Sequence, residues 1–332
     1  MHEIELTPHS PNPDLAILVA QASKFFGAAK SEATLTAYAG DNRDFKDFCA
    51  ANALPYLPST VESVTLYISH LASRVPPVSV ATISRRLAAI SYLHRQAGLE
   101  SPATPRRHFV LREVLAGIKR TLSAAPHGAK PLLSDEIRRI IAACPPTLLG
   151  TRDRSLILLG FAIGARRSML ASIIEIRDLT FTDRGLYILL RHGKTERFEA
   201  GPRPIAVPFG EHPETCPVLA TRAWIDAAGL SGSQGMLFRG IDRHGNVRAT
   251  PLCPRSIAKI LAKATGRAGI DVAAAHLSPH SLRVGMVSQS AINGAEERNI
   301  ARTTLHRSVA MVRRYIRDAD LFDNNASARL GL

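Results

Sequence analysis

The sequence predicts a mainly α-helical protein of two domains, with a small antiparallel β-sheet in the second domain. Its 332 residues exceed the usual length of a single domain. Apolar residues recur at helical spacing through most of the chain, whereas residues 177–210 alternate β-branched and aromatic side chains around Gly and Pro. Residues 124–131 are rich in Pro, Gly and small side chains, and they predict a linker between the two domains.

The first part of the chain is predicted to consist of a lead and a helical domain. Residues 1–30 form the lead, which contains one short helix that begins at Pro13. Residues 31–123 form the domain, in which Ser31 is the expected N-cap of the first helix. Apolar periodicity and chain breakers predict four helices in this domain: 31–54, 60–74, 78–99 and 110–122.

The third of these helices is a candidate DNA-contacting element. Residues expected to face the core recur at helical spacing: Ile83, Leu87, Ile90 and His94. Residues expected on the opposite, outward side are small, polar or basic: Arg85, Ala89, Tyr92 and Gln96. Such a surface suits a helix in a groove of DNA, and Arg85 and Arg86 are the candidate DNA contacts. An ordinary solvated face is the alternative.

The second part of the chain, residues 132–332, is predicted to be an α+β domain. A helix restarts over 132–144, with Ser134 as its N-cap and two acidic residues in its first turn. The apolar segment 151–173 predicts a largely buried pair of helices, and residues 177–210 predict the small sheet. Helices are expected from Cys216 to the end of the chain.

The charge balance favours a polyanionic partner. The chain has 42 Lys and Arg against 28 Asp and Glu, a formal net charge of +14. Residues 1–123 hold 13 of the basic and 10 of the acidic side chains, so most of the excess lies in the second part. Because a basic group set against a phosphate releases a condensed counterion, a partner with a phosphate backbone, such as double-stranded DNA, is expected. Charge alone leaves open a basic protein without such a partner.

Other classes of protein are disfavoured. The first 14 residues contain acids and prolines where a signal peptide has a basic and then an apolar run. The longest apolar run, residues 155–165, is about half as long as a membrane span. The four cysteines form no C-x-x-C pair, which argues against a zinc site. We therefore expect a cytoplasmic protein, nucleoid-associated when bound to DNA, with no membrane segment, metal or other cofactor.

Six candidate catalytic residues follow one another through the second domain: Arg166, Lys194, His280, Arg283, His306 and Tyr315. Each is a weak signal alone, but together they suit phosphoryl transfer without a metal. Two guanidiniums can hold the non-bridging oxygens of a phosphodiester and stabilise the charge of the transition state. A tyrosine hydroxyl can attack when cations and an imidazole help to remove its proton. A lysine on a turn can protonate the leaving oxygen.

The segments that carry these residues resemble the tyrosine recombinase (integrase) family, which includes Cre and the Xer recombinases. "GARRSML" resembles the G-x-R-x-S-E-L segment of the family, "SPHSLRVG" its H-x-x-R box, and "LHRSVAMVRRYIR" its closing box with the tyrosine. Residues 78–99 are similar to a DNA-contacting helix of the family, and residues 31–49 to the opening of its core-binding domain. The likeness extends from about Ser31 to the C-terminus.

The resemblance implies a helical core-binding domain and an α+β catalytic domain that close around DNA. It assigns Arg166 and Arg283 to a phosphate clamp and Lys194 to the general acid. The adjacent Arg167 is the alternative to Arg166, although the motif spacing favours Arg166.

The resemblance also assigns the remaining three residues. His280 becomes the proton acceptor or a phosphate ligand, His306 a second hydrogen-bond donor to the phosphate, and Tyr315 the nucleophile that forms a 3′-phosphotyrosyl bond. The implied enzyme is a site-specific recombinase that works without metal or ATP. It acts as a homotetramer on two inverted-repeat DNA sites and exchanges strands through a Holliday junction.

Two positions depart from the family pattern. Met169 occupies the place of the usual Glu, and Leu305 the place of the Gly before the second His. These departures leave open a DNA-binding homologue with weakened catalysis. A type IB topoisomerase-like enzyme, which uses similar chemical groups, is a second alternative. The tail, residues 317–332, is expected to dock either on its own domain or on a neighbouring subunit.

Overall fold

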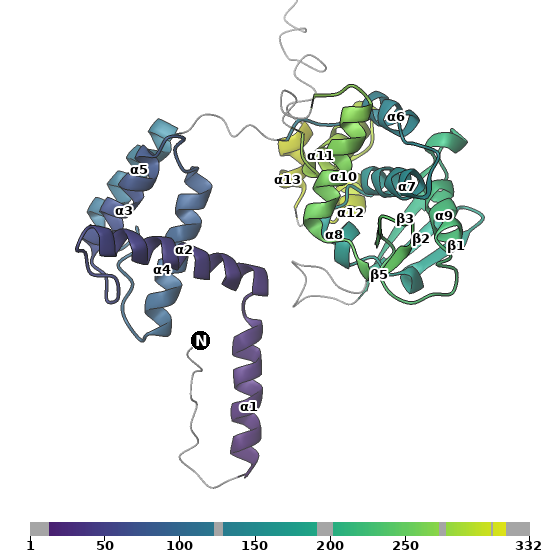
Figure 1. Cartoon of the computed structure of the whole chain (residues 1–332). Coiled ribbons are helices and arrows are strands. Elements are labelled where there is room, and N and C mark those ends of the chain that lie inside the picture. The colour runs from purple at the N-terminus through teal and green to yellow at the C-terminus, as the bar shows by residue number, and fades with distance from the viewer. Residues whose placement is uncertain (1–12, 123–128, 191–201, 272–276, 307, 317–332) are drawn as a thin grey trace, which may run out of the picture. The chain divides into compact units, whose positions relative to one another are not determined.

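The structure is a computed structural model of the chain, and it describes residues 13–122, 129–190, 202–271, 277–306 and 308–316 (Figure 1). The chain divides into two compact units, Met1–Pro126 and His127–Leu332. The division falls inside residues 124–131, the predicted linker. A helical first unit and a second unit with small antiparallel sheets confirm the predicted fold class.

Unit 1 is helical throughout its regular structure: α1 Pro13–Ala28, α2 Glu32–Ala51, α3 Val61–Ser73, α4 Val80–Gln96 and α5 Phe109–Leu122. Hydroxyl side chains begin three of these helices. Ser31, Thr60 and Ser79 each accept a hydrogen bond from a backbone N–H in the first turn of α2, α3 and α4. The N-cap predicted at Ser31 is thus confirmed. Helices α2 to α5 pack around an apolar core that contains Phe45 and Tyr67.

Helix α4 follows the prediction on its inner side and departs from it on the other. The four residues expected in the core are all buried: Ile83, Leu87, Ile90 and His94. Arg85 and Gln96 are exposed, as predicted. The outward placement of Ala89 is wrong, because this side chain is fully buried. Helix α4 packs against α2, α3 and α5, so its buried surface is wider than one stripe.

Unit 2 is built around the buried helix α7. Its helices are α6 Ser134–Ala142, α7 Leu148–Ala162, α8 Arg167–Ser172, α9 Pro217–Ala227, α10 Pro254–Arg267, α11 His280–Ile292, α12 Glu297–Thr304 and α13 Val309–Ile316, with short 3-10 turns η1 Ile176–Asp178 and η2 Pro213–Thr215. Helix α7 contacts α6, α9, α10 and α11, which explains its apolar character on nearly every side. Helices α7 and α8 are the predicted buried pair.

Helix α6 begins one residue earlier than the predicted N-cap implies. Leu133, and not Ser134, occupies the N-cap position, and Ser134 is the first helical residue. The Glu136 carboxylate accepts a hydrogen bond from the Leu133 N–H at 2.8 Å, so an acid of the first turn supplies the cap. The Ser134 N–H instead donates to the Gln289 side chain of α11 at 3.0 Å.

The predicted antiparallel sheet is present. Strands β1 Leu179–Thr182, β2 Gly185–Leu190 and β3 Arg203–Pro208 pair in the order β1-β2-β3. Alternate residues of the central strand, Leu186 and Ile188, are buried in the core of unit 2. The sheet therefore lines one side of the same core that surrounds α7.

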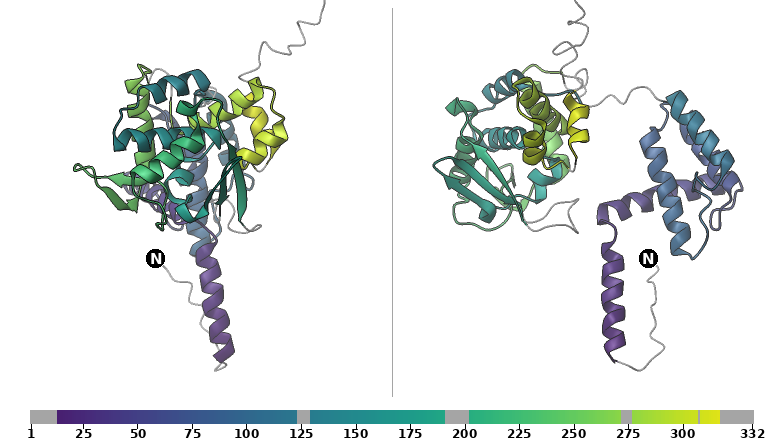
Figure 2. Two further views of the ribbon diagram at one scale, coloured as in Figure 1. Left: turned by 90° about the vertical axis from the view of Figure 1, so that its right-hand side faces the viewer. Right: turned by 180° about the vertical axis from the view of Figure 1, so that it is seen from behind.

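A second pair of strands contradicts the expectation of helices throughout the chain after Cys216. Strands β4 Arg239–Ile241 and β5 Val247–Pro251 form an antiparallel hairpin, which projects from the body of unit 2 in the left view of Figure 2. The Asp242 carboxylate accepts hydrogen bonds from the N–H groups of His244 and Asn246, at 2.8 and 3.0 Å. This side-chain turn favours a hairpin over a helix.

Two glycines allow segments of unit 2 to pack closely against one another. Gly164 lies in the turn between α7 and α8 with φ +55°, and a Cβ there would lie 2.7 Å from Thr304 Cγ2 at the end of α12. Gly285 lies on α11, where a Cβ would lie 1.9 Å from the Leu132 carbonyl oxygen. A Cβ at Gly164 would also lie 3.7 Å from Arg283 Cγ, so the α7–α8 turn, the first turn of α11 and the end of α12 meet.

Candidate active site

Helices α11 and α13 place an imidazole against a phenol. His280 Nε2 lies 3.0 Å from the Tyr315 hydroxyl oxygen, and the two rings meet edge to face with their centroids 5.7 Å apart. Burial, followed by the charges of Arg283 and Arg166, lowers the pKa of His280 below its usual value. The imidazole is therefore neutral at pH 7, and a neutral ring nitrogen can accept the hydroxyl proton of Tyr315.

The helix that carries Tyr315 is held on its neighbours by a small apolar cluster and one ion pair. Val312 of α13 packs with Val287 of α11 and Ile300 of α12, and all three are buried. Arg313 Nε donates to both carboxylate oxygens of Glu297, at 2.9 and 3.1 Å. These contacts are local to unit 2, so the unit itself positions the phenol beside His280.

Arg283 is a buried cation at the centre of the cluster. Its side chain is 1% exposed, and Nη1 donates a hydrogen bond of 2.7 Å to the Gly164 carbonyl oxygen. Nη2 is buried and has no hydrogen-bond partner among the described residues. Burial, followed by the charge of Arg166, lowers the pKa of Arg283 to about 10. A guanidinium fixed at one nitrogen and unpaired at another is suited to an incoming anion.

Arg166, rather than Arg167, belongs to this cluster. Arg166 is the N-cap of α8 and is half-buried, whereas Arg167 is exposed on the first turn. The charge of Arg166 lowers the pKa of three groups, His280, Arg283 and His306, while Arg167 acts on none of them. The extended backbone at Arg166 turns the chain from the Gly164 turn into α8.

His306 follows α12 and faces the same cluster. Its ring centroid lies 5.9 Å from that of Tyr315, and its Nδ1 lies 2.5 Å from Thr304 Oγ1. Nε2 is buried and without a hydrogen-bond partner among the described residues. Burial, with the charges of Arg283 and Arg166 next, lowers the pKa of His306 to about 4. The ring is therefore neutral near pH 7.

The structure thus brings together five of the six predicted catalytic residues: Arg166, His280, Arg283, His306 and Tyr315. The sixth, Lys194, lies outside the described residues, as does the tail 317–332. Sequence reasoning did not single out Thr304, because a threonine at the end of a helix is an ordinary helix-end residue. Only its contacts with His306 and Gly164 mark it.

The candidate DNA contacts of unit 1 lie in a network with acids. Arg85 forms an ion pair with Asp41, and Arg86 with Asp44. Arg86 also donates to the Tyr67 hydroxyl at 2.6 Å, and that hydroxyl donates to Asp44 at 2.7 Å. The Arg86 side chain is 13% exposed, whereas that of Arg85 is 43% exposed. This geometry leaves Arg85 accessible and favours a structural role for Arg86.

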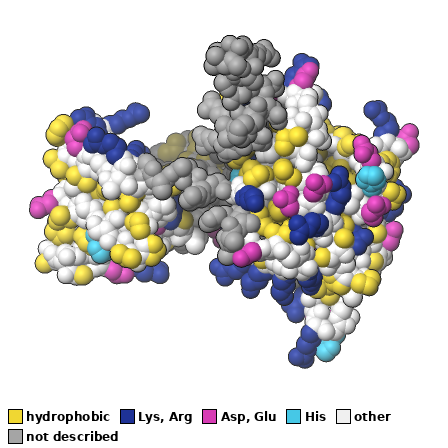
Figure 3. Space-filling model, turned by 90° about the horizontal axis from the view of Figure 1, so that it is seen from above, with side chains coloured by type: hydrophobic (Ala, Val, Ile, Leu, Met, Phe, Trp, Pro, Cys, Tyr) yellow, Lys and Arg dark blue, Asp and Glu magenta, His cyan; other side chains and the backbone are white. Residues whose placement is uncertain are grey.

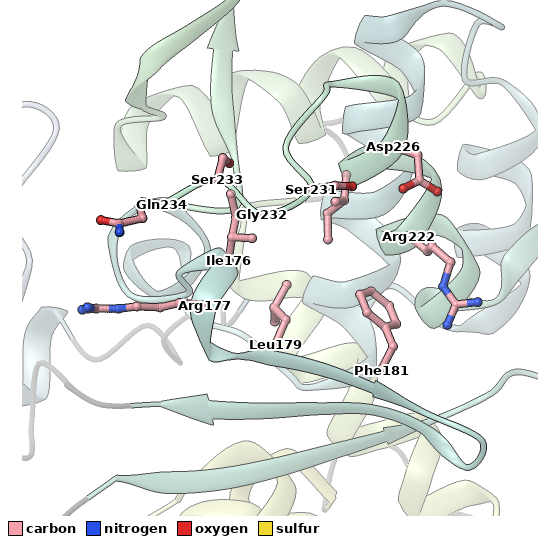
Figure 4. A pocket seen from close by; sticks show the side chains of 11 residues that line it. Ile176, Arg177, Leu179, Phe181, Arg222, Asp226, Ser231, Gly232, Ser233 and Gln234 are labelled. Carbon is pink, nitrogen blue, oxygen red and sulfur yellow. The ribbon is translucent and has the colours of Figure 1, made fainter.

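The cluster in unit 2 is distinct from the cavity shown in Figure 4. That cavity has a volume of about 610 Å³ and lies beside β1, between Phe181 and the loop at Ser231 and Gln234 (Figure 4). One wall is the guanidinium of Arg222, which lies 4.8 Å from the centroid of the Phe181 ring. None of the five clustered residues lines it.

The chemistry of the cluster is that of an anion site with an adjacent nucleophile. Two guanidiniums supply positive charge, and a phenol is hydrogen-bonded to a neutral imidazole. Lys and Arg side chains gather along one edge of unit 2 in Figure 3, as a polyanionic partner requires. No three His, Cys, Asp or Glu side chains of the described part are grouped to hold a metal ion. No described helix is both long and apolar enough to cross a bilayer.

Comparison with known proteins identifies the family. Residues 130–321 match the model of the phage integrase family. The chain is 35% identical over 312 residues to an integrase/recombinase xerD homolog of Selenomonas ruminantium, covering 93% of this chain and 89% of that protein. The chain belongs to the phage integrase family. It is a site-specific tyrosine recombinase, an enzyme that cleaves and rejoins DNA strands.

A further relative agrees with this assignment, and a solved structure shares the fold. The recombinase is 27% identical over 248 residues to tyrosine recombinase XerC of Syntrophus aciditrophicus, covering 72% of this chain and 70% of that protein. Its fold matches a lambda integrase tetramer bound to a Holliday junction with a TM-score of 0.56, at 14% identity. That match covers 93% of this chain and 82% of the other.

The two departures of this recombinase from the family pattern have clear structural settings. Met169 is 5% exposed and packs in the core of unit 2, so an apolar contact stands where the family has a carboxylate. Leu305 adopts the left-handed conformation with φ 53° at the end of α12, which explains a preference for Gly at this position. With Leu305 the helix still closes with a turn, in which the His306 N–H donates to the Ala301 carbonyl at 2.9 Å.

Proposed function

We propose that this recombinase cuts DNA by attack of the Tyr315 hydroxyl on a phosphodiester, which leaves a 3′-phosphotyrosyl bond. The observation that carries the proposal is the 3.0 Å contact between Tyr315 and His280 beside two guanidiniums. His280 accepts the phenolic proton as the oxygen–phosphorus bond forms. Arg166 and Arg283 hold the non-bridging oxygens, and the unpaired Nη2 of Arg283 supplies one of those hydrogen bonds.

His306 and Lys194 complete the proposed chemistry. His306 contributes a further hydrogen bond to the phosphate from the side of Tyr315. Lys194, which lies outside the described residues, is proposed to protonate the leaving 5′-oxygen, as the family resemblance implies. The phosphotyrosyl bond retains the energy of the broken phosphodiester, so rejoining needs neither ATP nor a metal.

The proposed assembly is a homotetramer on two inverted-repeat DNA sites in the cytoplasm. Its support is the shared fold with a lambda integrase tetramer that is bound to a Holliday junction. We propose residues 31–123 as the core-binding domain, 124–131 as the linker and 132–332 as the catalytic domain. The tail from residue 317 is proposed to dock on the neighbouring subunit, which would link assembly to the helix of Tyr315.

Covalent capture tests the proposal. A binding site is first selected from a random pool of duplexes by the full chain, and a nicked suicide duplex is then built on it. We expect a covalent protein–DNA adduct that is lost in Tyr315→Phe, with DNA binding retained, because only the nucleophilic oxygen is removed. Tyr187→Phe is the matched control, since Tyr187 is 40% exposed on β2. An adduct in Tyr315→Phe would show that another residue attacks.

The same substrate separates the alternatives. Adduct formation should persist in EDTA, and complete dependence on Mg²⁺ would overturn the proposed chemistry. Relaxation of supercoiled plasmid by the isolated subunit, without exchange between sites, would indicate a topoisomerase-like enzyme. Binding without any adduct would indicate a DNA-binding homologue with weakened catalysis.

A further inference from the structure

The hydroxyl of Thr304 determines which nitrogen of His306 carries a proton. Thr304 is 1% exposed, and its Oγ1 lies 2.7 Å from the Ile300 carbonyl oxygen and 2.5 Å from His306 Nδ1. A hydroxyl has one proton, and a carbonyl oxygen only accepts. The Thr304 hydroxyl therefore donates its proton to the Ile300 carbonyl oxygen. Its contact with His306 then requires Nδ1–H to donate to Oγ1.

The opposite nitrogen of His306 is left as an acceptor. In a neutral imidazole with its proton on Nδ1, Nε2 carries a lone pair. Nε2 is buried and has no hydrogen-bond partner in the described part of the chain. Among the described residues, the charged and titratable groups around the ring are Arg166 at the start of α8, His280 and Arg283 on α11, and Tyr315 on α13. Neutral His306 in this tautomer cannot donate a hydrogen bond to a phosphate oxygen.

The position of Thr304 is itself fixed by close packing. Its Cγ2 lies against Gly164, where a Cβ would come within 2.7 Å, and Gly164 also accepts the hydrogen bond from Arg283. The left-handed turn at Leu305 brings the His306 N–H back to Ala301. The threonine hydroxyl and the imidazole are therefore held from both sides, and the tautomer is a property of the fold.

We propose that Thr304 is a positioning residue that holds His306 with its proton on Nδ1, so that His306 takes up a second proton, at Nε2, when the scissile phosphate binds. Only the imidazolium then donates to the phosphate. This inference rests on the proposed function, in which His306 is a phosphate ligand. The proton comes from water, and no bond between heavier atoms forms or breaks.

Electrostatics supports the uptake of a proton at this point of the reaction. Without DNA, burial and the charges of Arg283 and Arg166 keep His306 neutral, with a pKa of about 4. A phosphate bound between the guanidiniums offsets their charge and adds an acceptor for Nε2–H, and both effects raise the pKa of His306. Binding therefore charges the ring where the negative charge arrives.

The tautomer is measured first, on the full chain without DNA. Nitrogen-15 chemical shifts distinguish a ring nitrogen that carries a proton from one that does not, and comparison with His306→Gln assigns the signals. We expect a protonated Nδ1 and an unprotonated Nε2 in His306. The opposite tautomer overturns the inference, whether or not the protein cleaves DNA, so this result is independent of the proposed function.

Proton uptake is measured in a second experiment, as the pH dependence of binding to the selected duplex at fixed salt. Every protein carries Tyr315→Phe, so that no cleavage intervenes. Where His306 titrates in the complex, the parent should lose up to about tenfold in affinity for each unit rise in pH. His306→Gln should lack this component, and the titration of His280 is common to all variants.

Variants of Thr304 decide its role. Thr304→Ser keeps the hydroxyl and should retain the pH slope of the parent. Thr304→Val should flatten the slope toward that of His306→Gln, because either ring nitrogen can then carry the single proton. Thr303→Val is the control on the same helix, since that hydroxyl donates to the Asn299 carbonyl at 3.0 Å and, within the described part of the chain, does not contact His306. Equal slopes for the parent and His306→Gln, or a parental slope in Thr304→Val, overturn the inference. If Thr304→Val does not fold, the first of these comparisons still decides it.

Discussion

The two units each contain a pair of arginines, and the pairs differ in their supply of carboxylates. In unit 1, Arg85 and Arg86 are ion-paired with Asp41 and Asp44. In unit 2, Arg166 and Arg283 act on one another, and neither is ion-paired with a described carboxylate. The positive charge of the unit 1 pair is therefore neutralised by carboxylates of the protein, whereas that of the unit 2 pair is not neutralised by any described carboxylate.

The difference separates a structural pair from an anion-binding pair. Burial, together with the uncompensated charge in unit 2, lowers the pKa of Arg283 to about 10 and that of His306 to about 4. An anion that arrives from outside offsets the positive charge and so acts to raise both pKa values. In unit 1 the acids already offset the positive charge, and an external phosphate would have to compete with them. Four predictions test this contrast, from the largest expected effect to the smallest.

The largest effect is expected in unit 2. Arg283→Lys should reduce the single-turnover rate of adduct formation on the suicide duplex by about 10²-fold or more, as does loss of an oxyanion donor. An ammonium keeps the charge, but it cannot bond the Gly164 carbonyl and present a second, planar donor to the phosphate. Arg166→Lys should have an effect of the same order.

Arg167→Lys is the matched control for this prediction. Arg167 is exposed and affects none of the clustered groups, so its replacement should leave the rate within about twofold of the parent. A severe loss in Arg167→Lys with a silent Arg166→Lys would shift the clamp by one residue. A silent Arg283→Lys would remove the distinction between the two arginine pairs.

The second effect concerns the stability of unit 1. Arg86→Met should lower the free energy of unfolding by about 3 kcal/mol, because it leaves the buried Asp41 and the Asp44–Tyr67 pair without their shared cation. Urea denaturation followed by circular dichroism measures the loss. Arg85→Met, at a side chain that is 43% exposed, should cost less than about 1 kcal/mol. Equal losses of stability in the two variants would show that the contribution of each arginine does not depend on how deeply its side chain is buried.

The same contrast shows which features of unit 1 the sequence predicts and which it does not. Helical periodicity placed Ile83, Leu87 and Ile90 in the core correctly, because those contacts are set by spacing along one helix. The same spacing could not show that Asp41, more than forty residues earlier, neutralises Arg85. The outward placement of Ala89 was wrong for a related reason, because a small side chain does not show how closely a neighbouring helix approaches.

The candidate active site likewise has a part that local motifs predict and a part that depends on distant segments. The order of the boxes in the sequence identified the residues that the structure brings together, because each box is a local motif. The tautomer of His306 depends on Thr304 and on the Gly164 turn, which lies some 140 residues earlier. The hairpin of β4 and β5 was missed because its turn depends on side-chain hydrogen bonds of Asp242 rather than on an apolar period.

The third effect is a dependence of stability on pH. Burial acts to raise the pKa of Asp44, but hydrogen bonds from Tyr67 and Arg86 and the charges of Arg86 and Arg74 outweigh it and lower that pKa. A carboxyl whose pKa is lowered by folding stabilises the fold above its unfolded pKa, near 3.9, and this contribution is lost as the pH falls through the folded value. Asp44→Asn should therefore cost about 1 kcal/mol at neutral pH and progressively less in acid.

Asp47→Asn is the control for this measurement, because Asp47 is exposed on the same helix. Its denaturation midpoint in urea should stay close to that of the parent at every pH. Asp41 is expected to respond in the opposite sense, since burial raises its pKa and the nearby arginines offset this only in part. A cost of Asp44→Asn that does not decline in acid would mean that the carboxylate charge is not what stabilises the network.

The smallest effect tests whether any of the unit 1 charge reaches DNA. A side chain that neutralises one phosphate contributes about 0.9 to the slope of log affinity against log salt. Arg85 is exposed but shares its charge with Asp41, so Arg85→Gln should lower the slope by less than this full amount. Arg86→Gln, if folded, should leave the slope unchanged, because its guanidinium is committed to Asp44 and Tyr67. Titrations of the selected duplex at several salt concentrations measure both slopes. Two unchanged slopes would assign both arginines to the packing of unit 1, and its contacts with DNA would then lie on other residues. A larger loss for Arg86→Gln than for Arg85→Gln would reverse the roles given to the two side chains.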